Sequence, residues 1–186
     1  MQIEAPKKLF TVDEYYRMAE AGILGPEDRV ELIDGEIIEM SPIGIRHLSC
    51  VNRATEAFIT AFKGRAVVSP QNPLRLSNYT EPQPDLVLLK PRADYYAAKH
   101  PYAEDALLVL EVSDTTLRYD RNVKLPHYAA AGIPEVWIEN LQEDLLLVCR
   151  DPSGNDYKTQ LTLQRGDSVS IAAFPDVTFN VADLLG

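Results

Sequence analysis

Two apolar segments of strand length, each carrying one acidic residue, constrain the fold of this chain more than any other feature. Residues 84–89 read Pro-Asp-Leu-Val-Leu-Leu, and residues 107–113 read Leu-Leu-Val-Leu-Glu-Val-Ser. A segment that is apolar at nearly every position is typical of a strand covered on both faces. Glu111 lies inside its segment, where an ionised carboxylate is costly unless a cation or a hydrogen-bond donor meets it. The sequence therefore predicts a polar site within a central sheet.

A lysine follows these segments near the start of an expected helix. Asp120, Lys124 and Tyr128 are spaced at i, i+4 and i+8, so on a continuous helix they would share one face. Pro126 complicates this arrangement, because a proline inside the first turns removes a backbone donor and could redirect Lys124. If the helix begins at about Val123 or later, Pro126 is harmless, but Asp120 then lies outside the helix.

Length and composition suit a globular protein of one domain. The chain has 186 residues, of which 46% are hydrophobic and 25% charged, and we expect a single domain over residues 1–186. No apolar segment approaches the roughly 20 residues of a membrane span. Cys50 and Cys149 show no metal-ligand spacing, so we expect reduced cysteines in a cytoplasmic protein.

The net charge of −10 argues against a generic nucleic-acid-binding protein, since phosphate contacts rely on Lys and Arg. The distribution of charge weakens that objection. Residues 41–75 carry five basic side chains and one acidic side chain, and residues 112–132 carry three basic and two acidic ones. The acidic residues gather toward the two ends of the chain, so a DNA-facing surface remains compatible with the composition.

The other segments predict an α/β protein with a mixed sheet. Thr11 and Glu14 form a capping-box pattern at a helix start, and the pair Asp34-Gly35 predicts a tight hairpin over residues 29–40. Apolar residues follow helical spacing over residues 47–62. We expect further strands near residues 66–68, 74–76, 136–138, 145–148 and 157–163, a turn at 151–156, and short β structure over 169–185.

Asp85 and Glu111 at neighbouring strand ends would suit a hard divalent cation. Mg²⁺ prefers oxygen ligands at about 2.0–2.1 Å and usually keeps several waters. Such a metal activates water and neutralises charge on a phosphoryl oxygen. Lys124 nearby could orient that water or stabilise the transition state.

Simpler interpretations exist for most of these residues. Asp85 could be solvated at the end of its strand, and His47 could merely begin a helix. Asp120 and Lys124 could form an exposed helix pair worth about 0.3–0.5 kcal/mol. Glu31 has about even odds of lying on the wet face of the hairpin by burial statistics. Glu111 is the hardest to dismiss, because its immediate neighbours are all apolar.

The acids carry a resemblance to a known superfamily. Pro-Asp at 84–85 followed by Glu-Val-Ser at 111–113 resembles the PD-(D/E)XK nuclease superfamily, and more closely the small bacterial Uma-type restriction endonuclease family. The stretches that resemble this family are residues 10–15, 30–36, 41–42 with His47, 83–85, 109–113, 119–120, Lys124, 128–134, 136–137 and 174–179.

The resemblance implies a restriction-endonuclease-like fold, a mixed central β-sheet flanked by helices. It implies that Asp85 and Glu111 bind Mg²⁺ or Mn²⁺, with the Val112 carbonyl as a further ligand. Glu31 would be the accessory acid that many members carry before the core.

The catalytic lysine departs from the superfamily pattern. It normally stands two residues after the strand glutamate, where this chain has Ser113, whereas the Uma-type pattern places it on the following helix, which matches Lys124. We therefore expect Lys124 to be catalytic, with Asp120, Tyr128, Ser113 and His47 as supporting residues.

The leading hypothesis is a Mg²⁺- or Mn²⁺-dependent endonuclease that cleaves DNA phosphodiesters with metal-activated water. The net acidity and the displaced lysine motivate an alternative, a catalytically inactive nuclease-like fold that binds DNA or protein. A third class, a structural protein that assembles through its sheet edge, has little support beyond the apolar C-terminal strands. The family resemblance is also compatible with a homodimer.

Overall fold

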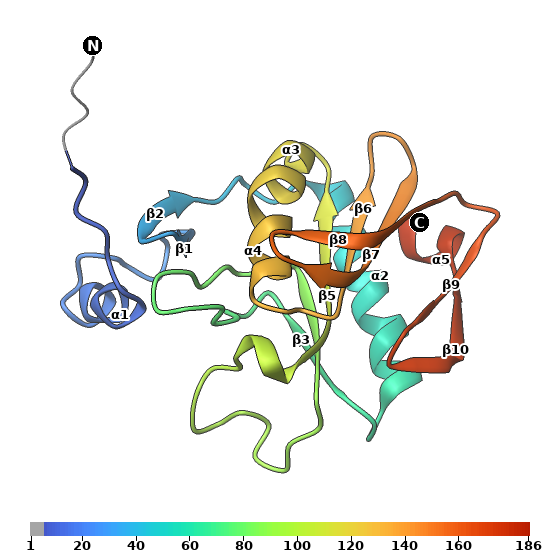
Figure 1. The fold of residues 1–186 in the computed structure, drawn as a ribbon, viewed down its shortest axis with the longest axis horizontal. Coiled ribbons are helices and arrows are strands. Elements are labelled where there is room, and N and C mark those ends of the chain that lie inside the picture. Colours follow the sequence, from blue (N-terminus) through green and yellow to red (C-terminus); the bar gives the residue numbers. More distant parts are fainter. Residues whose placement is uncertain (1–5) are drawn as a thin grey trace.

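A computed structural model describes residues 6–186 and places a six-stranded mixed sheet at the centre of the chain (Figure 1). β5 and β6 run parallel, and the other neighbouring strands are antiparallel. The expected α/β fold with a mixed sheet is confirmed. In spatial order the strands are β3 (Val67–Pro70), β4 (Leu86–Leu89), β5 (Ala106–Ser113), β6 (Glu135–Asn140), β7 (Leu145–Ser153) and β8 (Asp156–Leu163).

Helices and two small hairpins surround this sheet. No helix within residues 6–186 combines the length and apolar character needed to span a membrane. The remaining elements are α1 (Val12–Glu20), β1 (Val30–Ile33), β2 (Glu36–Glu39), α2 (Ile45–Phe62), η1 (Ala103–Asp105), α3 (Leu117–Tyr119), η2 (Asp120–Lys124), α4 (Leu125–Ala130), β9 (Ser168–Ile171), β10 (Phe174–Asn180) and α5 (Val181–Leu185).

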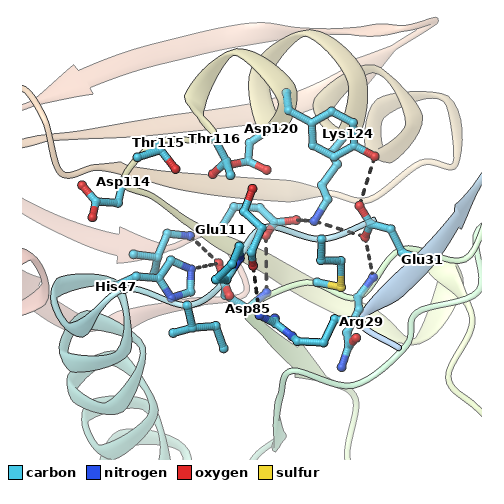
Figure 2. Close-up of a pocket in the computed structure, with 18 of the residues that line it drawn as sticks. Arg29, Glu31, His47, Asp85, Glu111, Asp114, Thr115, Thr116, Asp120 and Lys124 are labelled. Carbon is cyan, nitrogen blue, oxygen red and sulfur yellow. Dashed lines mark hydrogen bonds and ion pairs between the residues drawn. The ribbon is translucent and has the colours of Figure 1, made fainter. Parts of the chain in front are cut away.

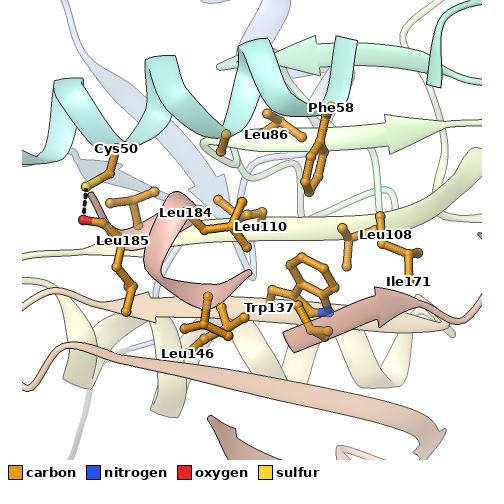
Figure 3. Close-up of a cluster of buried hydrophobic side chains, with 14 of the residues drawn as sticks. Cys50, Phe58, Leu86, Leu108, Leu110, Trp137, Leu146, Ile171, Leu184 and Leu185 are labelled. Carbon is orange, nitrogen blue, oxygen red and sulfur yellow. Dashed lines mark hydrogen bonds between the residues drawn. The ribbon is translucent and has the colours of Figure 1, made fainter. Parts of the chain in front are cut away.

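The central strands are apolar at nearly every position because both faces of the sheet are covered. On one face, Leu108 and Leu110 of β5 pack in a cluster with Phe58 of α2 and Trp137 of β6, and α5 contributes to the same cluster (Figure 3). On the other face, Val109 packs in a second cluster with residues of α4. Successive side chains of a strand point to opposite faces, so Glu111 lies on the face covered by α4.

The N-terminal elements form as expected. Thr11 Oγ1 accepts a hydrogen bond from Glu14 N (3.1 Å), and a Glu14 carboxylate oxygen accepts one from Thr11 N (2.9 Å), so the capping box of α1 is confirmed. Asp34 and Gly35 turn the β1–β2 hairpin with positive φ angles of 50° and 76°. A pair of backbone hydrogen bonds between Leu32 and Glu81 holds the hairpin against the segment that leads into β4.

Two local expectations are confirmed only in part, and one was wrong. The expected turn at 151–156 is confined to Gly154 and Asn155, because residues 151–153 extend β7; Pro152 is tolerated there because β7 pairs only with β8 beyond Arg150. The expected β structure over 169–185 is confirmed by β9 and β10, but the tail ends in helix α5, which buries one apolar face. No strand forms over 74–76, where Arg75 makes an isolated bridge to Tyr102.

Candidate active site

The antiparallel pairing of β4 and β5 brings Asp85 and Glu111 together. Leu86, which follows Asp85, pairs with Leu110, which precedes Glu111, so the start of one strand meets the end of the other. The backbone N–H of Asp85 donates to Glu111 Oε2 (3.4 Å), and the N–H of Val112 donates to Asp85 Oδ2 (2.8 Å). The two expected ligand residues are therefore neighbours in space.

Lys124 lies between two buried acids, as Figure 2 shows. Its Nζ is 3.2 Å from Glu111 Oε1 and 3.3 Å from Glu31 Oε2. The three side chains are 6%, 3% and 2% exposed, in the order Lys124, Glu111, Glu31. Burial acts to lower the pKa of Lys124, but the carboxylates of Glu111 and Glu31 outweigh it and raise that pKa. The ammonium is thus a fixed positive charge. Glu31 is buried and does not lie on the solvent-exposed face of the hairpin.

A π-helical turn places Lys124 in the site. Residues Asp120–Lys124 form η2, in which the N–H of Leu125 donates to the carbonyl of Asp120, five residues back. π turns are rare in proteins, and those that occur are frequently found at functional sites. Pro126 follows directly in the first turn of α4, so the helical path is continuous and Lys124 keeps its direction. The simple α-helical spacing expected for Asp120 and Lys124 does not apply across this wider turn.

Two of the expected supporting residues make hydrogen bonds to acids of the site, Asp120 and Glu111. Ser113 Oγ and Thr116 Oγ1 donate to Asp120 Oδ2 at 2.7 and 2.6 Å. Tyr128, buried on α4, donates to Glu111 Oε1 at 2.6 Å. Tyr128 therefore reaches Lys124 through the shared carboxylate of Glu111 instead of by direct contact.

Tyr119 is a site residue to which the sequence analysis assigned no role. Its hydroxyl donates to Glu31 Oε1 (3.1 Å), while the backbone N–H of Gln83 donates to Glu31 Oε2 (3.0 Å). Its place directly before Asp120 in a stretch that resembles the Uma-type family was the available signal. Together with Lys124, these donors compensate the buried charge of Glu31.

His47 in the first turn of α2 contacts Asp85. Its Nε2 lies 3.1 Å from Asp85 Oδ2, and its Nδ1 is buried without a hydrogen-bond partner among residues 6–186. Burial lowers the pKa of His47, but the hydrogen bond and charge of Asp85 outweigh it, so that pKa is raised. His47 does more than begin a helix, because it orients the carboxylate of Asp85.

Most of the candidate site residues line one cavity of about 470 Å³ (Figure 2). Arg29 and Arg118 lie in its wall and supply positive charge beside the acids. The candidate site residues among its lining are Glu31, His47, Asp85, Glu111, Asp120 and Lys124. The cavity therefore combines a carboxylate cluster with cationic groups suited to an anionic ligand.

The donor set fits a hard divalent cation. Within the described part of the chain, no group of three or more His, Cys, Asp or Glu side chains forms a preformed metal cage. Mg²⁺ commonly binds only one or two carboxylates and completes its coordination with waters. Asp85 and Glu111 can supply these carboxylates. Burial raises the pKa of Glu111 to about 8 despite the opposing charge of Lys124. The Glu111 carboxylate is thus under-compensated, and a bound cation would favour its ionised form.

Comparison with known proteins gives one family and one informative fold. The model of the Uma2 family, described as "Putative restriction endonuclease", matches residues 12–182. A solved structure from Anabaena variabilis ATCC 29413, titled as "a putative nuclease belonging to DUF820", aligns with a TM-score of 0.74 at 17% identity. The alignment covers 95% of this chain and 97% of that chain, so the fold is shared over nearly the full length. No curated protein matches the chain.

Proposed function

The chain belongs to the Uma2 family, and from that premise we propose that it is an endonuclease that hydrolyses DNA phosphodiester bonds with Mg²⁺ or Mn²⁺ as cofactor. The observation that carries this proposal is the position of Lys124, buried between Glu31 and Glu111 and beside Asp85. The carboxylates would supply a site for a metal cation, and the buried lysine would supply a fixed positive charge for a phosphoryl group.

Asp85 and Glu111 would hold the cation, and the backbone carbonyl of Val112 would be a further ligand. When bound, the metal supplies a Lewis acid and lowers the pKa of a coordinated water. His47 and the N–H of Val112 fix the orientation of Asp85, while Tyr128 fixes that of Glu111. The carboxylates are therefore held by hydrogen bonds before any ligand arrives.

Lys124 would act on the reacting phosphoryl group and the attacking water. Its ammonium is held by Glu31 and Glu111, so it loses little conformational freedom when a substrate binds. A preorganised positive charge stabilises the negative charge that develops in the transition state. Glu31 is the accessory acid in this scheme, because it positions Lys124.

A bound cation would favour entry of the reactive phosphate into the cavity. Glu31, Asp85, Asp120 and the ionised form of Glu111 would repel a phosphate, and Lys124 offsets only part of that charge. A divalent cation would reverse the balance at the centre. Arg29 and Arg118 would contact the flanking phosphates from the cavity wall.

Nicking of supercoiled plasmid DNA in Mn²⁺ or Mg²⁺ tests the proposal. The wild-type protein should relax the plasmid, and Lys124→Met should reduce the rate by at least about a hundredfold, as losses of preorganised electrostatic groups do. Lys158→Met changes an exposed lysine on β8 and serves as control. Equal nicking by wild type and Lys124→Met would remove the lysine from the reaction.

A catalytically inactive nuclease-like module that binds DNA or protein is the second candidate. Ser113 stands at the superfamily's lysine position, and the net charge is −10. In this case Asp85→Asn and Glu111→Gln would alter stability or partner binding, and the wild-type protein would show no metal-dependent cleavage. The same plasmid assay therefore separates the two candidates.

A further inference from the structure

A second polar centre lies beyond Glu31, built around the buried side chain of Glu81. Glu81 is 3% exposed. Its Oε1 accepts a hydrogen bond from the hydroxyl of Tyr16 (2.5 Å), and its Oε2 has no hydrogen-bond partner among residues 6–186. Burial raises the pKa of Glu81, and the Tyr16 hydrogen bond only partly opposes it. A buried acceptor of this kind gains from one more donor.

Aromatic and basic side chains surround this carboxylate. A hollow of about 200 Å³ is lined by Tyr16, Arg75, Glu81, Lys99, His100 and Tyr102. The rings of Tyr16 and His100 are stacked, with centroids 5.4 Å apart and planes 17° apart. Lys99 Nζ lies 4.5 Å from the centroid of the Tyr102 ring. The lining of this hollow thus combines aromatic rings, one buried acceptor and basic side chains.

A third cavity links the hollow to the candidate active site through shared lining residues. This cavity, of about 330 Å³, shares Tyr16 and Glu81 with the hollow. It shares Glu31 and Gln83 with the active-site cavity. Glu81, Gln83 and Asp85 are spaced two residues apart on one segment, so an extended ligand that follows it reaches from the carboxylate of Glu81 to the catalytic acids.

We propose that this hollow binds one nucleobase with an exocyclic amino group, in a nucleic-acid strand whose reactive phosphate lies at Asp85 and Glu111. The inference rests on the proposed nuclease function and adds to it a base preference. Aromatic side chains stack on bases of any sequence. A carboxylate accepts a hydrogen bond from an amino group, as Glu and Asp do from cytosine N4.

Thymine and uracil are disfavoured by the same chemistry. They carry a carbonyl oxygen where cytosine carries its amino group, and that oxygen would face Glu81 Oε2 with no proton between them. Lys99 at the rim, and Arg75, which also pairs with Asp13 (3.3 Å), would contact the neighbouring phosphates. The size of the hollow, below the roughly 300–1,000 Å³ of sites for drug-sized molecules, suits a single planar group.

Binding of labelled 12-residue oligo-dC and oligo-dT in EDTA tests the inference without any cleavage. Fluorescence anisotropy should show that wild type binds oligo-dC at least about fivefold more tightly, the lower end of discrimination by one good base contact. Tyr16→Phe keeps Glu81 and an aromatic face, so it should keep the preference. Tyr16→Phe with Glu81→Met removes both partners of the buried hydrogen bond and should bring the ratio to about one.

The design separates failure of this site from failure of the nuclease proposal. Equal affinity of wild type for the two oligonucleotides, or no binding of either, would overturn the base site and leave metal-dependent cleavage to its own assay. A preference that persists in the folded double variant would also overturn it. Asp85→Asn should keep the preference, because the base contact lies outside the catalytic acids. Thermal melting by circular dichroism establishes that each variant is folded.

Discussion

The ammonium of Lys124 lies 3.2 Å from Glu111 Oε1, with both side chains withdrawn almost wholly from water. Glu31 holds the same ammonium at 3.3 Å from the other side. The positive charge of Lys124 therefore offsets acids that arrive from β1 and β5, and it ties the N-terminal hairpin to the central sheet. Removal of this charge should affect both stability and function.

Lys124→Met should destabilise the protein strongly at neutral pH and above. It leaves Glu31, and from about pH 8 upward also Glu111, buried without their shared cation, and loss of one partner of a buried ion pair costs about 3–5 kcal/mol. Urea unfolding followed by circular dichroism measures the change. Lys158→Met should stay within about 0.5 kcal/mol of wild type, because Lys158 is exposed. An equally small effect of Lys124→Met would contradict the buried ion-pair assignment.

Glu111 should make stability and metal binding depend on pH in opposite directions. Burial raises its folded pKa from 4.5 to about 8, so its contribution to stability is present below pH 4.5 and is lost as pH rises toward 8. A cation needs the ionised carboxylate, so Mn²⁺ affinity should rise over the same range. Glu111→Gln should flatten the stability profile. Calorimetric titrations from pH 5.5 to 9 check this, and a pH-independent affinity would contradict it.

Tyr128→Phe should raise the pKa of Glu111 further. The Tyr128 hydroxyl donates to Glu111 Oε1 at 2.6 Å and lowers the pKa of Glu111 against the effect of burial. Its loss should cost about 1–3 kcal/mol of stability and move the pH midpoint of Mn²⁺ binding to a higher value. Tyr157→Phe is the matched control, since its buried hydroxyl donates to the Ile133 carbonyl outside the site. Unchanged midpoints in both variants would show that Tyr128 does not tune Glu111.

Glu139 should destabilise the protein at alkaline pH. The side chain is buried on β6, and neither carboxylate oxygen has a hydrogen-bond partner in the described residues. Burial raises the pKa of Glu139 well above its ordinary value, so its neutral form is stable in the core and stability is lost as pH rises through the folded pKa. Glu139→Met should therefore raise the melting temperature relative to wild type more at pH 9 than at pH 5. A larger gain at pH 5 would contradict this.

The sequence predicted the centre of the site because that centre depends on local patterns. Fully apolar segments place β4 and β5 inside a covered sheet, and antiparallel pairing then sets Asp85 beside Glu111. The position of Lys124 came from its likeness to the Uma-type pattern. Its geometry did not follow from helical spacing, because η2 is a π turn and hydrogen bonds five residues apart leave no clear sequence signal.

Long-range contacts explain what the sequence left open. Glu31 is buried because backbone bonds between Leu32 and Glu81 fix the hairpin against a segment about fifty residues later in the chain. The contact of His47 with Asp85 likewise depends on how α2 packs against the sheet. The hollow at Glu81 combines α1 with loop residues from two later segments, so no single motif announces it.

The central claim is that Asp85 and Glu111 bind one divalent cation, and calorimetric titration of the full chain with Mn²⁺ at pH 8.5 tests it most directly. Wild type should bind one ion, whereas Asp85→Asn and Glu111→Gln should each weaken binding at least about tenfold, as loss of a metal ligand or its immediate support does. Asp34→Asn, which changes an exposed turn residue that tolerates Asn, should bind as wild type does. Mn²⁺ binding that is unchanged in both site variants, or absent from the folded wild-type protein, would contradict the account.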